Sequence, residues 1–164
     1  MKISCCWLYA TAKYGTPPSP ADTQRALKDI AALGFSAVEM EAAGEEQVRG
    51  LHAARTELRA LGDDLGLRIV AFRPVLPKLI HADKTRRVQA LDLFKLAVET
   101  ATAFGAETIQ TAGYPPPAID AAFRWDDLWG RLVDSLGACA DEAARADLTF
   151  CVEPRAGDIV STTD

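Results

Sequence analysis

The sequence predicts an α/β fold of parallel (β/α) repeats, a partial TIM barrel with about five of the eight strands of the complete fold. Short apolar runs alternate with longer amphipathic stretches along the whole chain. Each repeat takes about thirty residues, enough for the crossover that joins parallel strands. Several expected strands also end in polar residues, as at the catalytic end of a barrel. We therefore expect residues 1–164 to form a single, incomplete barrel domain.

Local signals mark where the expected helices and strands begin and end. Ser19 suits an N-cap, Pro20 the first helical position, and Gly34 a left-handed residue after the helix. The third strand is expected to end before Pro74, because proline cannot continue a central ladder. The expected strands are 2–7, 35–40, 67–72, 106–113 and 148–154, and the expected helices are 19–34, 45–66, 84–104 and 126–145.

Two architectures accept this order of elements: an open doubly wound sheet and part of a TIM barrel. The turn after the first expected strand, residues 8–20, contains neither G-x-G-x-x-G nor a P-loop, which disfavours the nucleotide-binding open sheets. Alternation within 35–40 and 148–154 places apolar side chains on one face and small or polar ones on the other. Both faces of an open sheet are covered by helices and would be more uniformly aliphatic, so the barrel is favoured.

Composition and charge argue against several classes of function. The formal net charge is −5, which gives a nucleic-acid partner no electrostatic support. The first apolar run is too short for a signal peptide or a membrane span, so no membrane partner is expected. The four cysteines show neither a secreted disulfide framework nor a C-x-x-C zinc spacing. We expect a cytoplasmic protein with buried, reduced thiols.

Carboxylates at the ends of strands are the main candidates for chemistry. Glu153 ends the fifth expected strand, where an ionised carboxylate needs a partner: a divalent cation, a substrate, solvent or neighbouring Arg155. Glu39 and Glu41 form a second carboxylate group on one face at the end of the second strand, where they could bind a hard cation or help with proton transfer. For Glu41 the start of a solvated loop is the favoured alternative. Arg73 follows the third strand and suits a substrate phosphate or carboxylate, although an ion pair with a nearby Glu is favoured.

The histidines and the aromatic residues near the N-terminus are weaker candidates. His52 is expected on the surface or in the packing of the second helix. His81 lies in a loop on the expected catalytic side, where a solvated histidine is the commoner case. Trp7, Tyr9 and Tyr14 follow the first expected strand, and lining a sugar-sized pocket and ordinary packing explain them equally well.

Three stretches carry a family resemblance in their order and spacing: "LGFSAVEM", "LFKLAVETATAFGAETIQTAG" and "ACADEAARADLTFCVEPRAGDIVSTTD". Together they resemble the sugar phosphate isomerase/epimerase family, the xylose isomerase-like TIM barrels. The resemblance implies that Glu153 ligates Mn2+, Mg2+, Co2+ or Zn2+ and moves a proton beside a substrate carbonyl through an enediolate. It further implies a small sugar or sugar phosphate as substrate. The residues expected to contact that substrate are Glu39, Arg73, Gln110 and Arg155.

The sequence also departs from this family. Many members carry a histidine where this chain has the stretch around Gln110, which weakens any interpretation as an endonuclease with several histidine-bound zinc ions. The family's remaining metal ligands lie on strands six to eight, which the chain lacks. We therefore expect part of such an enzyme, with weak or absent metal binding and with open sheet edges through which a homo-oligomer can form. Two alternatives stay open: a metal-dependent dehydratase or other lyase on the same barrel, and a non-catalytic binding or interaction module.

Overall fold

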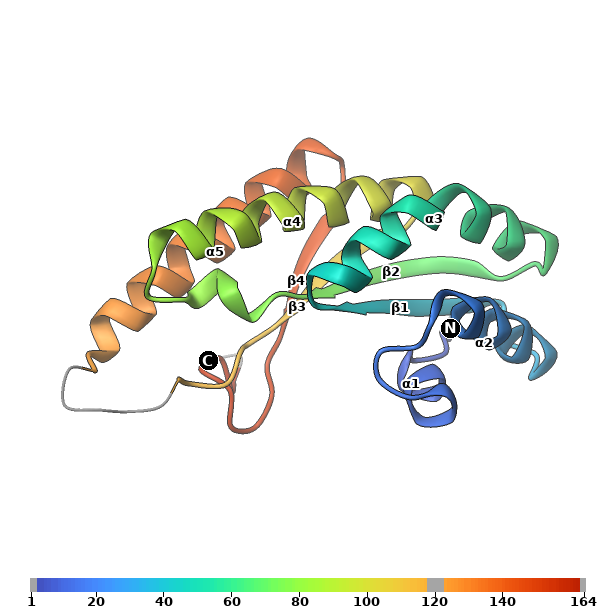
Figure 1. Ribbon diagram of the computed structural model, residues 1–164, viewed down its shortest axis with the longest axis horizontal. Helices are drawn as coiled ribbons and strands as arrows, with labels where there is room; N and C mark the ends of the chain where they lie inside the picture. Colours follow the sequence, from blue (N-terminus) through green and yellow to red (C-terminus); the bar gives the residue numbers. More distant parts are fainter. Residues whose placement is uncertain (1–2, 118–122, 163–164) are drawn as a thin grey trace.

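The computed structural model describes residues 3–117 and 123–162 of the chain. Within these ranges a parallel sheet contains β1 (Ala37–Ala43), β2 (Arg68–Val75), β3 (Thr108–Ala112) and β4 (Thr149–Glu153), in that spatial order. The helices are α1 (Leu8–Tyr14), α2 (Pro20–Ala32), α3 (Gly44–Asp64), the 3-10 helix η1 (Pro77–Ile80), α4 (Lys84–Phe104) and α5 (Trp125–Arg145). Figure 1 shows α3, α4 and α5 on one side of this sheet, as in a sector cut from a barrel. The expected class, parallel (β/α) repeats that form part of a TIM barrel, is confirmed.

The prediction of a first strand at residues 2–7 is wrong. In the described part of residues 2–7, the sheet pairing is a single parallel bridge between Cys5 and Val38. Around this bridge the Cys5 N–H donates to the Ala37 carbonyl, and the Glu39 N–H donates to the Cys5 carbonyl. The chain turns into α1 directly after the buried Trp7. The pairing therefore cannot extend beyond this single bridge into a ladder. The described sheet therefore has four strands rather than five.

Strand β2 extends further than the sequence predicts. It continues through Arg73 and Pro74, whereas its ladder with β3 ends at the pair Phe72 and Ile109. Pro74 thus lies beyond the part of β2 that is paired on both sides, a position at which a sheet tolerates proline. The extension places Arg73 inside the sheet, in register with Glu41 of β1.

The hydrophobic core lies between the sheet and the helices that cover it. Phe72 of β2 packs edge-to-face on Phe104 of α4, with ring centroids 5.7 Å apart. Phe94 of α4 packs in the same way on Phe150 of β4, at 5.8 Å. The alternation of each strand sends its apolar side chains toward these helices, as expected. The opposite face carries polar side chains at the carboxyl ends of the strands, together with small apolar ones such as Ala71.

The helix signals in the sequence are confirmed. The Ser19 side chain accepts a hydrogen bond of 3.1 Å from the Asp22 N–H at the start of α2. Gly34 follows α2 with a positive φ of 89°, and Gly105 ends α4 in the left-handed conformation with φ of 69°. None of the helices in the described ranges combines the length and the apolar character needed to cross a membrane.

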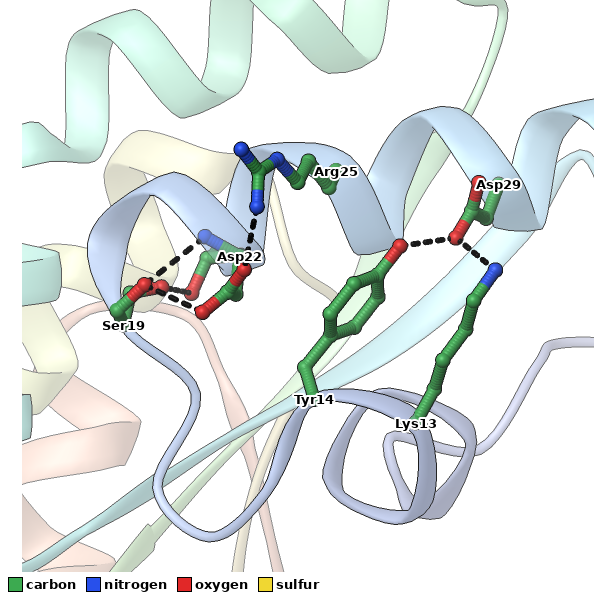
Figure 2. Close-up of polar contacts among 7 residues, drawn as sticks. Lys13, Tyr14, Ser19, Asp22, Arg25 and Asp29 are labelled. Atoms are coloured by element: carbon green, nitrogen blue, oxygen red, sulfur yellow. Dashed lines mark hydrogen bonds and ion pairs between the residues drawn. The ribbon is translucent and has the colours of Figure 1, made fainter.

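An ionic cluster joins α1 to α2. Figure 2 shows Lys13 and Tyr14 of α1 both pointing at Asp29 of α2. The Lys13 Nζ lies 2.6 Å from Asp29 Oδ2, and the Tyr14 hydroxyl donates to the same oxygen. The hydrogen bonds from Lys13 and then Tyr14 lower the pKa of the Asp29 carboxyl below its ordinary value. The cluster therefore stabilises the docking of α1 on α2 while Asp29 is ionised.

This cluster predicts a pH dependence of the free energy of unfolding. A carboxyl whose pKa is lower in the folded state stabilises the fold above its unfolded-state pKa of about 4. That stabilisation is lost as the pH falls through the lower folded-state pKa. We expect Asp29→Asn to lose less stability than the wild type between about pH 5 and pH 2, measured by urea denaturation at each pH. The control Asp141→Asn, at an exposed position on α5, should follow the wild type. Equal pH slopes for Asp29→Asn and the wild type would contradict the assignment.

Candidate active site

The carboxyl ends of the parallel strands meet at one edge of the sheet and surround a cavity. Its space, counted together with the open solvent at its mouth, is about 400 Å³. Every strand of the described sheet contributes at least one polar side chain to the lining, which also includes Trp7. These polar side chains are Glu39 and Glu41 from β1, Arg73 from β2, Gln110 from β3 and Glu153 from β4.

The structure therefore brings together four of the five residues that the sequence predicts for the site. Glu39, Arg73, Gln110 and Glu153 all line the cavity. Their side chains share one face because paired residues of neighbouring strands, and residues two positions apart within a strand, point the same way. Arg73 is in register with Glu41, two positions after Glu39, and Gln110 is in register with Cys151, two positions before Glu153. Their placement is a finding, whereas their roles toward a metal or a substrate stay predictions.

A single guanidinium connects two of the carboxylates. The Arg73 Nη1 lies 3.3 Å from Glu41 Oε2, and the Arg73 Nη2 lies 3.2 Å from Glu153 Oε2. The side chains of Arg73 and Glu41 are each 21% exposed, and that of Glu153 is 45% exposed. The ion pair that the sequence favoured for Arg73 is present, with a carboxylate on either side.

Glu41 corrects one of the sequence-based expectations. It does not begin a solvated loop, because β1 continues past it to Ala43 and its side chain pairs with Arg73. Strand alternation in the sequence places Glu41 on the same face as Glu39, but its pairing with Arg73 depends on the extension of β2 beyond residue 72. Glu41 is thus a further carboxylate of the site, and it faces the same guanidinium as Glu153.

Glu39 is held from the N-terminal side of the chain. The Ser4 hydroxyl donates a hydrogen bond of 2.8 Å to Glu39 Oε1. Trp7, next to it in the cavity wall, is only 3% exposed. The sequence gives no signal for Ser4, because this contact spans 35 residues of chain and arises from the bridge beside β1.

Arg155 does not join the cavity lining or the Glu153 carboxylate. Its Nε donates to Asp158 Oδ2 at 2.8 Å, and this hydrogen bond raises the pKa of Arg155 above its ordinary value. The backbone of the same loop bonds to the loop after β3: the Ile159 N–H donates to the Tyr114 carbonyl at 2.7 Å. Arg155 therefore shapes the loop after β4, and a contact with substrate stays a prediction.

Both histidines lie away from the cavity lining. His52 Nδ1 is 3.1 Å from the Thr100 hydroxyl, so it contributes to the packing of α3 on α4, as expected. His81 Nδ1 accepts a hydrogen bond of 2.9 Å from the Asp83 N–H, just before α4. Neither histidine offers a metal ligand to the cavity.

The donor set of the cavity does not by itself fit a divalent cation. Within residues 3–117 and 123–162, no group of three or more His, Cys, Asp or Glu side chains converges as a metal site would require. Two of the carboxylates in the cavity already pair with a positive charge, the Arg73 guanidinium. Hard divalent cations take about six oxygen or nitrogen ligands, so further donors would be needed from outside the described residues.

The fold and the position of the cavity define a class of barrel protein with its site at the carboxyl ends of the strands. A sequence profile described as xylose isomerase-like TIM barrel matches residues 27–164. The chain belongs to this family. No curated protein sequence shows significant similarity to it.

Solved structures share the fold at low sequence identity. A D-psicose 3-epimerase, solved in the presence of D-fructose, aligns with a TM-score of 0.69 and 18% identity over 96% of this chain and 54% of its own. The IolI protein with a bound zinc atom aligns with a TM-score of 0.68 and 15% identity, over 98% of this chain and 54% of its own. The probable 3-DHS dehydratase AsbF of Bacillus anthracis aligns with a TM-score of 0.68 and 14% identity, over 98% of this chain and 54% of its own. The chain thus spans about half the length of these structures.

Proposed function

We propose that this chain carries part of the active site of a sugar or sugar phosphate isomerase or epimerase. In this proposal Glu153 transfers the proton on one face of the carbon beside the substrate carbonyl, and epimerisation needs a second acid–base group on the opposite face. The observation that carries the proposal is the convergence of polar side chains from four successive strands on one cavity at their carboxyl ends. Membership in the xylose isomerase-like family and the likeness to sugar epimerases support it.

The residues of the cavity suit proton transfer beside a carbonyl. A general base must reach the proton that it removes, and Glu153 is the most exposed member of the Arg73 ion-pair cluster. Removing that proton leaves negative charge on the substrate oxygens, and the Arg73 guanidinium is placed to stabilise it. Gln110 and Glu39 offer hydrogen-bond partners for sugar hydroxyl groups in the same wall.

Family membership also implies a divalent cation, which supplies Lewis-acid polarisation of the substrate oxygens when it is bound. Glu153 is the side chain of this chain that we propose as one of its ligands. The structure of the IolI protein, which contains a zinc atom, supports a metal in this class of barrel. Because the described residues do not complete a cation site, no step of the proposed mechanism here is assigned to the metal.

The likeness to a probable 3-DHS dehydratase supports a second candidate, a lyase on the same barrel. A dehydratase shares the first step, because a base removes a proton beside a carbonyl before water leaves. The two functions differ in their products. An epimerase delivers a proton to the opposite face of the same carbon, whereas a dehydratase forms a product that is lighter by one water.

The proposal is tested on the complete reading frame that contains this chain, whatever its length, with added Mn2+ or Mg2+. Ketoses such as D-fructose, D-tagatose and L-ribulose are supplied in D2O, and the products are resolved by chromatography and proton NMR. We expect an epimer that carries deuterium on the carbon beside the carbonyl. Hydroxyketone acids are supplied in parallel, and a dehydrated product from them would favour the lyase. No exchange and no product with any of these substrates would contradict both enzymatic functions and leave a binding module.

A further inference from the structure

Arg73 is the one cation among the described residues that line the cavity, and two carboxylates already share its charge. Its Nη1 lies 3.3 Å from Glu41 Oε2, and its Nη2 lies 3.2 Å from Glu153 Oε2. Its Nε is buried, without a hydrogen-bond partner among the described groups. A guanidinium recognises phosphate through a fork of two nitrogens, and either fork of Arg73 includes a nitrogen that already contacts a carboxylate. A phosphate can therefore bind Arg73 only in competition with Glu41 or Glu153.

The other charged side chains of the described lining are negative. Glu39, Glu41 and Glu153 face a single guanidinium, so the wall carries more carboxylates than cations. Arg155 does not correct this excess, because it lies outside the lining and pairs with Asp158. A phosphate group carries a charge of about −1.5 to −2 near pH 7, which this wall repels. The partial burial of Arg73 and Glu41 limits how far solvent screens the repulsion.

The same side chains suit an uncharged sugar. The carboxylate oxygens of the wall accept hydrogen bonds, and the Gln110 amide both donates and accepts them. Each hydroxyl group of a sugar can donate to a carboxylate or accept from an amide, whereas the oxygens of a phosphate act chiefly as acceptors. The described lining is thus complementary to hydroxyl groups rather than to a phosphate.

We propose that Glu41 makes the cavity selective for an uncharged sugar over a sugar phosphate. It adds negative charge to the wall, and it holds the end of the Arg73 guanidinium that would otherwise be free to turn toward a phosphate. Glu41 thus determines specificity through Arg73 and through its own charge, without a contact to the sugar. The inference rests on the proposed function, in which this cavity holds the substrate, and it narrows the substrate to one of the two classes named there.

The test titrates the purified chain, without added divalent cation, with D-fructose and with D-fructose 6-phosphate, and follows the amide NMR signals of the residues that line the cavity. At low ionic strength we expect the phosphate to bind at least about tenfold more weakly than the free sugar. In about 1 M NaCl the ratio of the two dissociation constants should narrow, because the Debye length falls to about 3 Å.

Variants of Glu41 locate the effect. Glu41→Gln removes the charge and releases one end of Arg73, so the ratio should narrow about fivefold or more, mainly through tighter binding of the phosphate. Glu41→Asp keeps the charge and should retain most of the selectivity. Glu46→Gln is the matched control, because it removes the same charge at an exposed position outside the lining, and it should change the ratio by less than about twofold.

Circular dichroism checks the fold of each variant, and the wild-type ratio and its salt dependence test the inference even if Glu41→Gln folds poorly. Three results would overturn it: no binding of D-fructose, equal or tighter binding of the phosphate by the wild type, or a ratio that a folded Glu41→Gln leaves unchanged. The proposed function is judged separately, by turnover of the complete reading frame. Turnover of sugar phosphates alone would overturn the selectivity and leave the function standing. Selectivity of the chain without any turnover would contradict the function and leave the selectivity standing.

Discussion

Replacing Glu153 by Gln is expected to lower the rate of epimerisation by the complete reading frame about 10²–10⁴-fold, the usual contribution of a general acid–base group. The amide keeps the size of the side chain but can neither remove a proton nor bind Arg73 as an anion. Deuterium exchange beside the substrate carbonyl should fall by the same factor, because it reports the proton transfer alone. Both rates are measured with one ketose in D2O, by chromatography and by proton NMR.

A second carboxylate controls for the loss of negative charge. Glu46 lies in the first turn of α3, is exposed, and does not line the cavity, so Glu46→Gln is the control variant. It should leave both rates unchanged, and both variants should unfold at about the temperature of the wild type, because the Glu153 side chain is close to half exposed. Retention of more than about a tenth of the exchange rate by Glu153→Gln would show that another group moves the proton.

Phe94→Ala is expected to lower the free energy of unfolding by about 3–5 kcal/mol, as deletion of a buried aromatic ring typically does. The Phe94 ring is fully buried and packs edge-to-face on Phe150 of β4. Its loss leaves a cavity between α4 and the strand that carries Glu153. Urea denaturation of the purified chain, followed by circular dichroism, measures the change in midpoint and slope.

A second position on α4 provides the comparison for Phe94. Val88 is 50% exposed, so Val88→Ala should change the stability by no more than about 0.5 kcal/mol. A loss below about 1.5 kcal/mol for Phe94→Ala would show that the site collapses around the missing ring or that the ring is not packed as described.

The four helices that the sequence predicts match α2, α3, α4 and α5 closely because their signals are local, whereas the short helices α1 and η1 are not predicted. The expected helix at 84–104 matches α4 at both ends, where Asp83 caps the first turn and Gly105 takes the left-handed conformation. The strands are less predictable, because a strand exists only through its neighbours. The stretch around Cys5 has the composition of a strand but makes a single bridge. Pro74 remains in β2 because the β2–β3 ladder ends at Phe72 and Ile109, so no pairing with β3 requires its missing N–H.

The candidate site shows the same difference between local and long-range signals. Glu39, Arg73, Gln110 and Glu153 are predictable, because the alternation of each strand and the shared carboxyl edge of a parallel sheet place them together. The partners of these residues are not predictable, since each contact joins distant segments. Glu153 pairs with Arg73, 80 residues away, rather than with Arg155 two positions further on.

The central claim is that the carboxyl-end cavity of the sheet is a sugar site. Its most direct test is an amide NMR titration of the isotopically labelled chain with D-fructose. We predict that the largest shifts lie at Glu39, Arg73, Gln110 and Glu153. Largest shifts around Gly105 at the opposite ends of the strands, around Ser135 in the groove between α4 and α5, or nowhere in the chain, would contradict the claim.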